Sequence, residues 1–206
     1  MTHPRDHWEA VYRSKPAEGV SWYQPHAWRS MDFIRATGLG TDARIIDVGG
    51  GASTLVDDLL VGGWRDVTVL DLSSAALAVA QQRLGDAARG VTWIAGDACH
   101  APLTDAAFDI WHDRAVFHFL TDAADRAAYV RQVMRCVRPG GHVIVATFAP
   151  DGPTQCSGLP VARYAPDELH REFGPAFTLL EHADEQHHTP WGAVQHFVYC
   201  HCVKPH

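Results

Sequence analysis

The sequence predicts a single α/β domain built on a doubly wound sheet of seven strands, mostly parallel, with one antiparallel strand in a closing C-terminal hairpin. Three features of the chain predict it. An apolar, β-branched run at residues 44–48 is followed at once by Gly49, Gly50 and Gly51. From there to about residue 148, strand patterns alternate with helix patterns. Two strand patterns then follow a short helix, with Gly192 in the turn between them.

The N-terminal residues 1–37 are expected to form a helical cover. Helix patterns occupy residues 4–15 and 25–37, and the segment that joins them contains Trp22 and Tyr23. Exposed loops seldom carry adjacent aromatic rings unless the rings cover something. We therefore expect Trp22 and Tyr23 to form a lid over a bound ligand, with ordinary core packing as the alternative.

The middle of the chain, residues 44–148, supplies the ligand-binding core. Its strands are expected at residues 44–48, 67–70, 91–95, 108–111 and 142–148. Glycines after the first strand let the backbone turn tightly and approach a ligand at a distance where a Cβ would clash. Ser73 is expected to cap a helix that runs to about Leu84. An amphipathic helix covers residues 123–137 and is expected to end at the Pro139-Gly140-Gly141 turn.

The C-terminal residues 149–206 carry a different pattern. A loop rich in turn-forming residues spans residues 150–160, and a short helix follows at about residues 167–173. Two strands, at about residues 177–187 and 193–203, form the closing hairpin. No repeat or linker interrupts the chain, so residues 1–206 are expected to form one domain.

Composition excludes several classes of protein. A chain of 206 residues that is 47% hydrophobic can bury one substantial core. Its formal charge of −7 argues against a nucleic-acid surface. No apolar run approaches the roughly 20 residues of a membrane span, and no signal-peptide core is present. Five cysteines fit a reducing compartment better than a disulfide framework, so a cytoplasmic protein is expected.

A series of motifs follows in order along the chain: Asp47, Gly49, Gly51 and Ser53 around the first turn, Asp71 and Asp97 after the second and third strands, Phe108-Asp109-Ile110 in the fourth, and Arg138-Pro139-Gly140-Gly141 before the fifth. No one of them is specific, but their order and spacing together are. The chain resembles the class I S-adenosylmethionine-dependent methyltransferases, which have a Rossmann-like sheet. The resemblance covers nearly the whole sequence.

This resemblance implies S-adenosylmethionine as the cofactor. It implies that Asp71, with Leu72 beside it, holds the ribose, whose two hydroxyls suit a carboxylate acceptor. Asp97, with Ala98, is expected at the adenine amine. The turn formed by Gly49, Gly50, Gly51 and Ser53 is expected to offer backbone N–H groups to the methionine tail, with Asp47 facing its ammonium group. Trp22 and Tyr23 would cover the bound cofactor.

Other roles remain open for these residues. The glycine turn belongs to dinucleotide folds in general, although the NAD fingerprint requires a third glycine at position 54, which is Thr54 here. Asp71 is alternatively a helix cap, and Asp97 a turn-forming acid.

Two further segments indicate the substrate class. Trp8-Glu9-Ala10-Val11-Tyr12 and Trp22-Tyr23-Gln24 are similar to the N-terminal cover of small-molecule methyltransferases of the thiopurine and tellurite type. Residues 112–119 are similar to the fourth-strand motif of that group. There we expect Asp113 and Arg114 to face the ligands and His118 to act as a general base. The alternatives are a surface ion pair and a structural histidine.

The sequence therefore predicts methyl transfer to a small-molecule nucleophile by in-line attack on the sulfonium methyl. The rival functions are a protein-lysine methyltransferase on the same fold and a non-catalytic cofactor-binding module. The expected partner is a small acceptor, without nucleic acid or membrane, in a monomer or homodimer. No metal site is expected, because Cys200 and Cys202 on the closing hairpin suit buried apolar positions. Cys156 lies on the loop that borders the substrate side.

Overall fold

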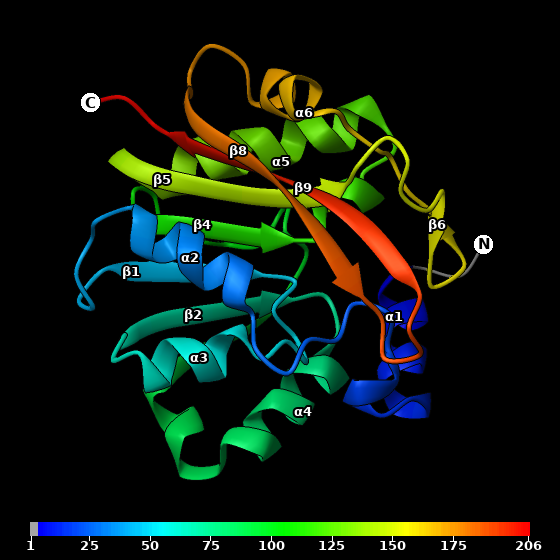
Figure 1. Ribbon diagram of the computed structural model, residues 1–206. Helices are drawn as coiled ribbons and strands as arrows, with labels where there is room; N and C mark the ends of the chain where they lie inside the picture. Colours follow the sequence, from blue (N-terminus) through cyan, green and yellow to red (C-terminus); the bar gives the residue numbers. More distant parts are fainter. Residues whose placement is uncertain (1–3) are drawn as a thin grey trace.

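The structure is a computed structural model that describes residues 4–206. Its sheet has seven strands in the order β3-β2-β1-β4-β5-β9-β8 (Figure 1). The strands are β1 (Arg44–Val48), β2 (Asp66–Asp71), β3 (Val91–Ala95), β4 (Phe108–Arg114), β5 (Val137–Phe148), β8 (Thr178–His188) and β9 (Val194–Val203). Strand β9 pairs antiparallel with β5 and β8, whereas the first five strands pair in parallel. The predicted sheet is confirmed.

Helices cover both faces of this sheet (Figure 1). They are α1 (Pro4–Ser14), α2 (Trp28–Ala36), α3 (Leu55–Val61), α4 (Ser74–Leu84), α5 (Ala123–Cys136) and α6 (Pro166–Phe173), with 3₁₀ turns η1 (Ala17–Gly19), η2 (Gly85–Gly90) and η3 (Phe117–Phe119). Ser73 caps α4 as predicted, because its side chain accepts a hydrogen bond from the Ala76 N–H.

The core has two parts, one on each face of the sheet. On one face Met31 of α2, Leu59 of α3 and Leu77 of α4 pack against strands β1 and β2. On the other face Tyr129 of α5 and Leu169 of α6 belong to a second cluster, together with Trp111 of β4, Val143 of β5 and Val198 of β9. Cys200 and Cys202 are buried in the second part, as expected for apolar positions. Because the helices cover the two faces of the sheet, the carboxyl ends of the parallel strands stay available for a binding site.

Three segments differ from the prediction. Strand β4 continues past Trp111 to Arg114, because His112 and Asp113 still pair with β1. Strand β5 begins at Val137, so the Pro139–Gly141 turn lies within the strand, where the register with β4 shifts between Phe108 and Ile110. The loop after β5 contains a small hairpin of β6 (Gln155–Cys156) and β7 (Leu159–Pro160). Its tight turn places Ser157 and Gly158 at φ values of 49° and 78°.

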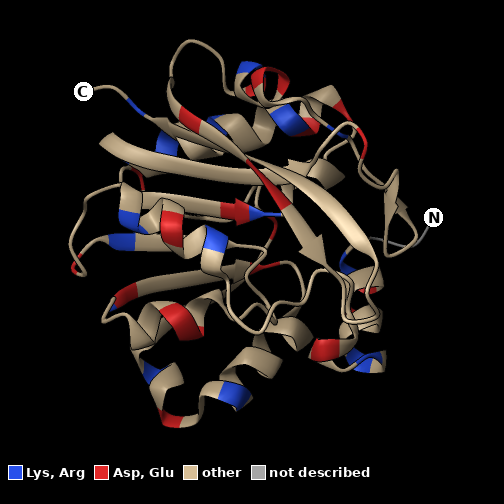
Figure 2. Cartoon of the chain, viewed as in Figure 1, with Lys and Arg blue, Asp and Glu red and all other residues tan. Residues whose placement is uncertain are grey.

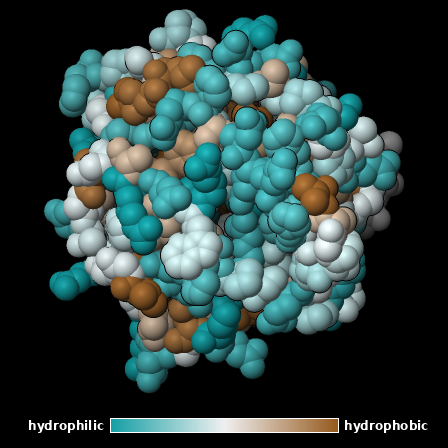
Figure 3. Space-filling model, in the orientation of Figure 1, coloured by the Kyte–Doolittle hydropathy of each residue, from teal (hydrophilic) through white to brown (hydrophobic). Residues whose placement is uncertain are grey.

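Charged residues lie mostly on helices and loops, and the central strands carry few of them (Figure 2). The tip of β4 is an exception, because it ends in Asp113 and Arg114. The face of the molecule seen in Figure 3 is largely hydrophilic, with small and separate hydrophobic patches. Within residues 4–206, no helix combines the length and the apolar character that crossing a bilayer requires.

Candidate active site

A cavity of about 520 Å³ opens at the carboxyl ends of the parallel strands. Strands β1 and β4 are neighbours at the point where the strand order reverses, which is where doubly wound sheets bind their ligands. The walls come from the turns after β1, β2, β3 and β4, from α1 and the segment after it, and from the β6–β7 hairpin. Residues of these walls include Trp8, Tyr12, Trp22, Gly49, Asp71, Leu72, Asp97, Ala98, Arg114, Val116, Phe119 and Cys156.

The glycine turn brings its backbone to the edge of this cavity. Gly49 has a φ of 70°, and a Cβ at this position would collide with the Val116 side chain. Gly50 is packed against the Asp47 carboxylate and Gly51 against the Asp71 carboxylate, so larger residues would not fit at either position. The predicted role of these glycines, close approach of the backbone to a ligand, therefore has a steric basis.

A second, smaller pocket of about 40 Å³ lies beside the same turn. It shares Trp22, Gly49 and Arg114 with the large cavity, so the two spaces meet at the glycine turn. Its other lining residues include Tyr23, Ser30, Asp47, Gly50, Ser53 and His112. The pocket adds room for a short polar group next to Asp47.

Asp71 closes the cavity at the end of β2. The residue is 8% exposed, and its carboxylate accepts the backbone N–H groups of Ser73, at 2.8 Å, and of Gly51. Burial nevertheless raises the pKa of Asp71 to about 7. These two N–H groups fix the orientation of the carboxylate, as the binding of a diol would require.

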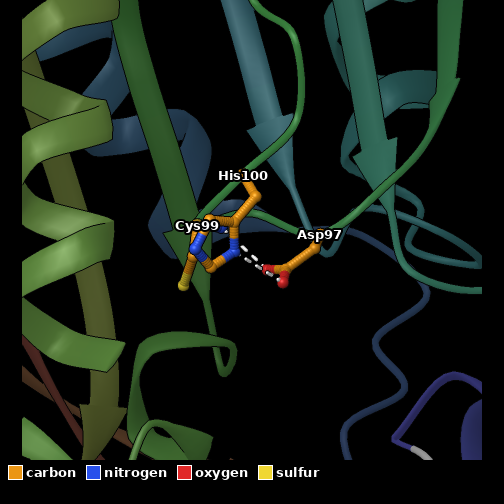
Figure 4. Close-up of side chains that lie close together, drawn as sticks. All are labelled: Asp97, Cys99 and His100. Atoms are coloured by element: carbon orange, nitrogen blue, oxygen red, sulfur yellow. Dashed lines mark hydrogen bonds and ion pairs between the residues drawn. The ribbon is translucent and has the colours of Figure 1, made fainter. Parts of the chain in front are cut away.

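Asp97 follows β3 on an exposed loop with Cys99 and His100 (Figure 4). Its Oδ1 accepts the Cys99 N–H at 2.8 Å, and its Oδ2 lies 3.0 Å from His100 Nδ1. Partial burial opposes ionisation, but these hydrogen bonds outweigh it and lower the pKa of Asp97. The Asp97, Cys99 and His100 ligand atoms lie within 4.8 Å of one another. Our expectation that the chain holds no metal stays a prediction.

Aromatic rings of the N-terminal cover form the opposite wall. The Trp8 ring centroid lies 5.8 Å from that of Trp22 and 5.1 Å from that of Phe119, and Tyr12 lies 6.3 Å from Trp22. Trp22 lines both spaces, whereas Tyr23 lines the small pocket alone. An apolar and largely aromatic surface therefore faces the glycine turn.

Hydrogen bonds fasten this cover at two places. The Glu9 carboxylate accepts the Ser74 N–H at 2.6 Å and so caps α4 from another helix. Farther along, the Gln24 amide donates to Glu185 of β8 at 2.6 Å, and His187 Nε2 lies 2.6 Å from the Ser21 carbonyl oxygen. The cover is thus joined to α4 at one end and to the closing hairpin at the other.

Arg114 is the one residue of the fourth-strand trio, Asp113, Arg114 and His118, that reaches the cavity. Its guanidinium pairs with Glu185 at 3.2 Å and donates to the Tyr199 hydroxyl at 3.1 Å. It also lies 4.2 Å from the centre of the Phe197 ring. These contacts fix the position of a largely buried cation beneath the N-terminal cover.

Asp113 and His118 lie behind the cavity wall instead of on it. Both are fully buried. The Asp113 carboxylate accepts the N–H groups of Val116 at 2.9 Å and Phe117 at 3.1 Å, and the Tyr129 hydroxyl at 2.5 Å. Burial raises its pKa to about 6. Asp113 therefore shapes the turn that packs against Gly49.

His118 lies in η3 with its ring against Phe119 and Phe148. Neither ring nitrogen has a hydrogen-bond partner in the described part of the chain, and burial lowers its pKa to about 3. His118 is not among the residues that line the cavity, and its role as a general base stays a prediction.

Sequence reasoning missed several residues of the site. It assigned no role to Glu185, which is 71 positions from Arg114. It quoted Trp8, Glu9 and Tyr12 only as part of a resemblance, although the i, i+4 spacing of Trp8 and Tyr12 places both rings on one face of a helix. The contact between Glu9 and α4 has no signal in the sequence.

Comparison with known proteins agrees with this geometry. Residues 46–145 match a family model described as a methyltransferase domain. The ubiquinone/menaquinone biosynthesis C-methyltransferase UbiE of Coxiella burnetii (strain Dugway 5J108-111) is 31% identical over 129 residues, which cover 60% of this chain and 50% of that protein. A demethylmenaquinone methyltransferase of Beutenbergia cavernae is 30% identical over 122 residues, 59% of this chain and 47% of that protein. The chain spans about half the length of these curated relatives.

Solved structures show a similar fold. The 1,6-didemethyltoxoflavin-N1-methyltransferase of Burkholderia thailandensis, bound to 1,6-didemethyltoxoflavin and S-adenosylhomocysteine, superposes with a TM-score of 0.73 at 19% identity and covers 100% of this chain and 92% of its own. A protein studied for conversion of a disulfide bond into a thioacetal group during echinomycin biosynthesis gives 0.77 at 20% identity, covering 98% and 93%. Residues 46–145 are therefore similar to a methyltransferase domain, and the chain shares its fold with a methyltransferase that binds S-adenosylhomocysteine.

Proposed function

We propose that the protein is an enzyme that transfers the methyl group of S-adenosylmethionine to a small-molecule nucleophile. The observation that carries the proposal is the shape of the cavity. Backbone and carboxylates line one side, at Gly49 and Asp71, and the rings of Trp8 and Trp22 close the other side. A concave space of about 520 Å³, walled on two sides, suits a cofactor and a compact acceptor better than a protein surface.

The similarity to methyltransferases implies S-adenosylmethionine as the cofactor, and the residues present fit it. Asp71, with Leu72, would hold the ribose, and Asp97, with Ala98, the adenine. The N–H groups of Gly49, Gly50, Gly51 and Ser53 would face the methionine carboxylate. Asp47 has one buried carboxylate oxygen without a partner in the described chain, which suits the methionine ammonium group. Trp22 and Tyr23 would cover the tail from the small pocket.

The bound cofactor supplies a methyl group on a positively charged sulfur, which needs no acid to leave. The work of the chain is then to orient the acceptor in line with that methyl group and to exclude water. The aromatic walls would attract the positive sulfur, by about 0.5–2 kcal/mol per ring when desolvated. Arg114 would orient the acceptor from the floor, while Asp113 and His118 support the wall behind it.

The test is production of S-adenosylhomocysteine by the purified protein with a panel of small amines, thiols, phenols and carboxylates, in competition with lysate proteins. We expect at least one panel member to be methylated. Asp71→Asn serves as the control, because it should weaken cofactor binding and abolish the product at low cofactor concentration.

Two outcomes would contradict the proposal. Methylation of a lysate protein, with no small molecule methylated, would favour a protein-lysine methyltransferase. Binding of S-adenosylhomocysteine without methylation of any acceptor, in the panel or in the lysate, would favour a non-catalytic module.

A further inference from the structure

A series of buried polar side chains leads away from the small pocket. Asp47 Oδ1 lies 2.7 Å from His112 Nδ1, and His112 Nε2 lies 2.8 Å from Ser30 Oγ. Ser30 Oγ lies 3.5 Å from the Tyr199 hydroxyl. Asp47 and His112 are each 2% exposed, and Ser30 is 1% exposed. These groups must therefore satisfy their hydrogen bonds with one another and not with solvent.

The imidazole of His112 is fixed at both nitrogens. An ionised carboxylate only accepts hydrogen bonds, so the proton of this contact lies on Nδ1, which donates to Asp47. The Nε2 atom is held by the Ser30 hydroxyl of α2. Because strand pairing places Asp47 of β1 directly opposite His112 of β4, the two side chains also have a fixed spacing. The Asp47 carboxylate thus has one defined orientation.

This orientation leaves the second carboxylate oxygen unused. Asp47 Oδ2 is buried and has no hydrogen-bond partner in the described residues. It faces Gly50, where a Cβ would occupy the space next to the oxygen, and Asp47 and Gly50 both line the small pocket. A buried acceptor of this kind is costly unless a ligand supplies a donor, and an ammonium group is the donor best matched to its charge.

We propose that His112 is a positioning residue for the methyl donor: it holds Asp47 so that the free oxygen receives the ammonium group of the methionine tail. Ser30 supports His112 in this role. The proposal rests on the cofactor assignment above and is independent of the acceptor. It predicts that His112 contributes to cofactor binding only through the amino-acid tail.

Calorimetry with two probes tests this prediction without any turnover. S-adenosylhomocysteine carries the tail, and 5′-methylthioadenosine lacks it but keeps the adenine and the ribose. His112→Leu should weaken binding of S-adenosylhomocysteine by about tenfold to hundredfold, the effect of a lost hydrogen bond to a charged group. Binding of 5′-methylthioadenosine should change by less than about twofold, because Asp71 and Asp97 remain in place.

Milder variants keep the test decisive if His112→Leu does not fold. His112→Asn retains a donor near the position of Nδ1 and should recover most of the affinity. Ser30→Ala should give a smaller loss, again confined to the probe with the tail. In an Asp47→Asn background, His112→Asn and Ser30→Ala should have almost no further effect on tail-dependent affinity, because the group they position is gone.

Equal losses for both probes would show that His112 merely supports the fold, and the proposal would be abandoned. The same holds if none of the variants changes affinity for S-adenosylhomocysteine, or if the effects of His112 and Asp47 substitutions add. A failure of the acceptor panel described above would leave these binding results intact, so the two proposals fail separately.

Discussion

Asp71 occupies surroundings that oppose the charge its proposed role requires. Burial raises its pKa to about 7, although two backbone N–H groups favour the ionised form. The ionised carboxylate offers the two ribose hydroxyls more acceptor sites than the neutral carboxyl group, one of whose oxygens carries a proton. Near neutral pH Asp71 is therefore divided between the neutral carboxyl, which burial favours in the ligand-free protein, and the carboxylate, which ribose binding favours.

This conflict predicts a pH-dependent affinity. Binding of S-adenosylhomocysteine should weaken as the pH falls from 8 to 6 through the pKa of about 7, because the neutral carboxyl offers fewer acceptors. Asp71→Asn should bind about tenfold to hundredfold more weakly at pH 8 and should lose this pH dependence. Asp66→Asn, at the exposed start of the same strand, is the matched control. Wild-type affinity in the Asp71 variant would remove this residue from the ribose site.

The contribution of Asp71 to the stability of the ligand-free fold should change in the direction opposite to ligand affinity: it should become less favourable as the pH rises. A carboxyl group whose folded pKa lies above its unfolded value of 3.8 destabilises the fold increasingly as the pH rises through this window. The ligand-free Asp71→Asn variant should therefore gain more in melting temperature at pH 8 than at pH 5, relative to wild type. An equal gain at the two pH values would show that the charge is not the cause.

Single residues also show where sequence reasoning stops. The ends of β1, β2 and β3 could be located from the glycines and the acids that follow them, since parallel strands end at one edge of the sheet. Asp113 and Arg114 were expected to face the same ligands. Strand β4 continues through both, so adjacent side chains point to opposite faces: Asp113 to Tyr129 of α5 and Arg114 to the cavity. A polar strand end has no apolar alternation that would have revealed this.

Among the elements, helix α1 is held by the contacts of a few side chains. None of its residues is fully buried. It is held by aromatic contacts of Trp8 and Tyr12 and by Glu9, which caps α4. The hydrogen bond from Ser74 is the main cause that lowers the pKa of Glu9, so this contact is present above acidic pH and lost as the carboxyl protonates. Residues 20–24, in contrast, are tied to β8 by Gln24.

The two halves of the cover should therefore open separately. Glu9→Gln should increase amide hydrogen exchange in residues 4–14, because the charge at the α4 N-terminus is lost, and should leave residues 20–24 unchanged. Glu18→Gln, in the exposed η1 turn, is the matched control. S-adenosylhomocysteine should restore protection if the cover closes over the cofactor. Equal exchange of wild type and Glu9→Gln would mean that aromatic packing alone holds α1.

For the molecule as a whole, the layers are joined by a few buried polar contacts as well as by apolar packing. The Tyr129 hydroxyl of α5 donates to Asp113 of β4 at 2.5 Å and accepts from Trp111 Nε1 at 2.9 Å. The Tyr164 hydroxyl is also buried but has no partner among the described residues. Both rings pack against Phe117. The chain thus offers two tyrosines in similar packing with unequal hydrogen bonding.

Removing each hydroxyl should separate the contribution of the hydrogen bonds from that of the ring packing. Tyr129→Phe leaves a buried carboxylate and an indole N–H short of a partner, so the free energy of unfolding should fall by about 1–3 kcal/mol. Tyr164→Phe removes a group without a partner and should be nearly neutral. Urea denaturation of the two variants measures both values. Equal losses would show that the bond between helix and strand has no special contribution.

The placement of β9 between β5 and β8 has a consequence for biosynthesis. The contacts that fasten Ser21 and Gln24 reach across 166 and 161 positions to His187 and Glu185 of β8. A ribosome releases these residues after Gly49, Asp71 and Asp97 have emerged. A nascent chain therefore has the strands that line the cavity before β8 is available to fasten residues 20–24 of the cover.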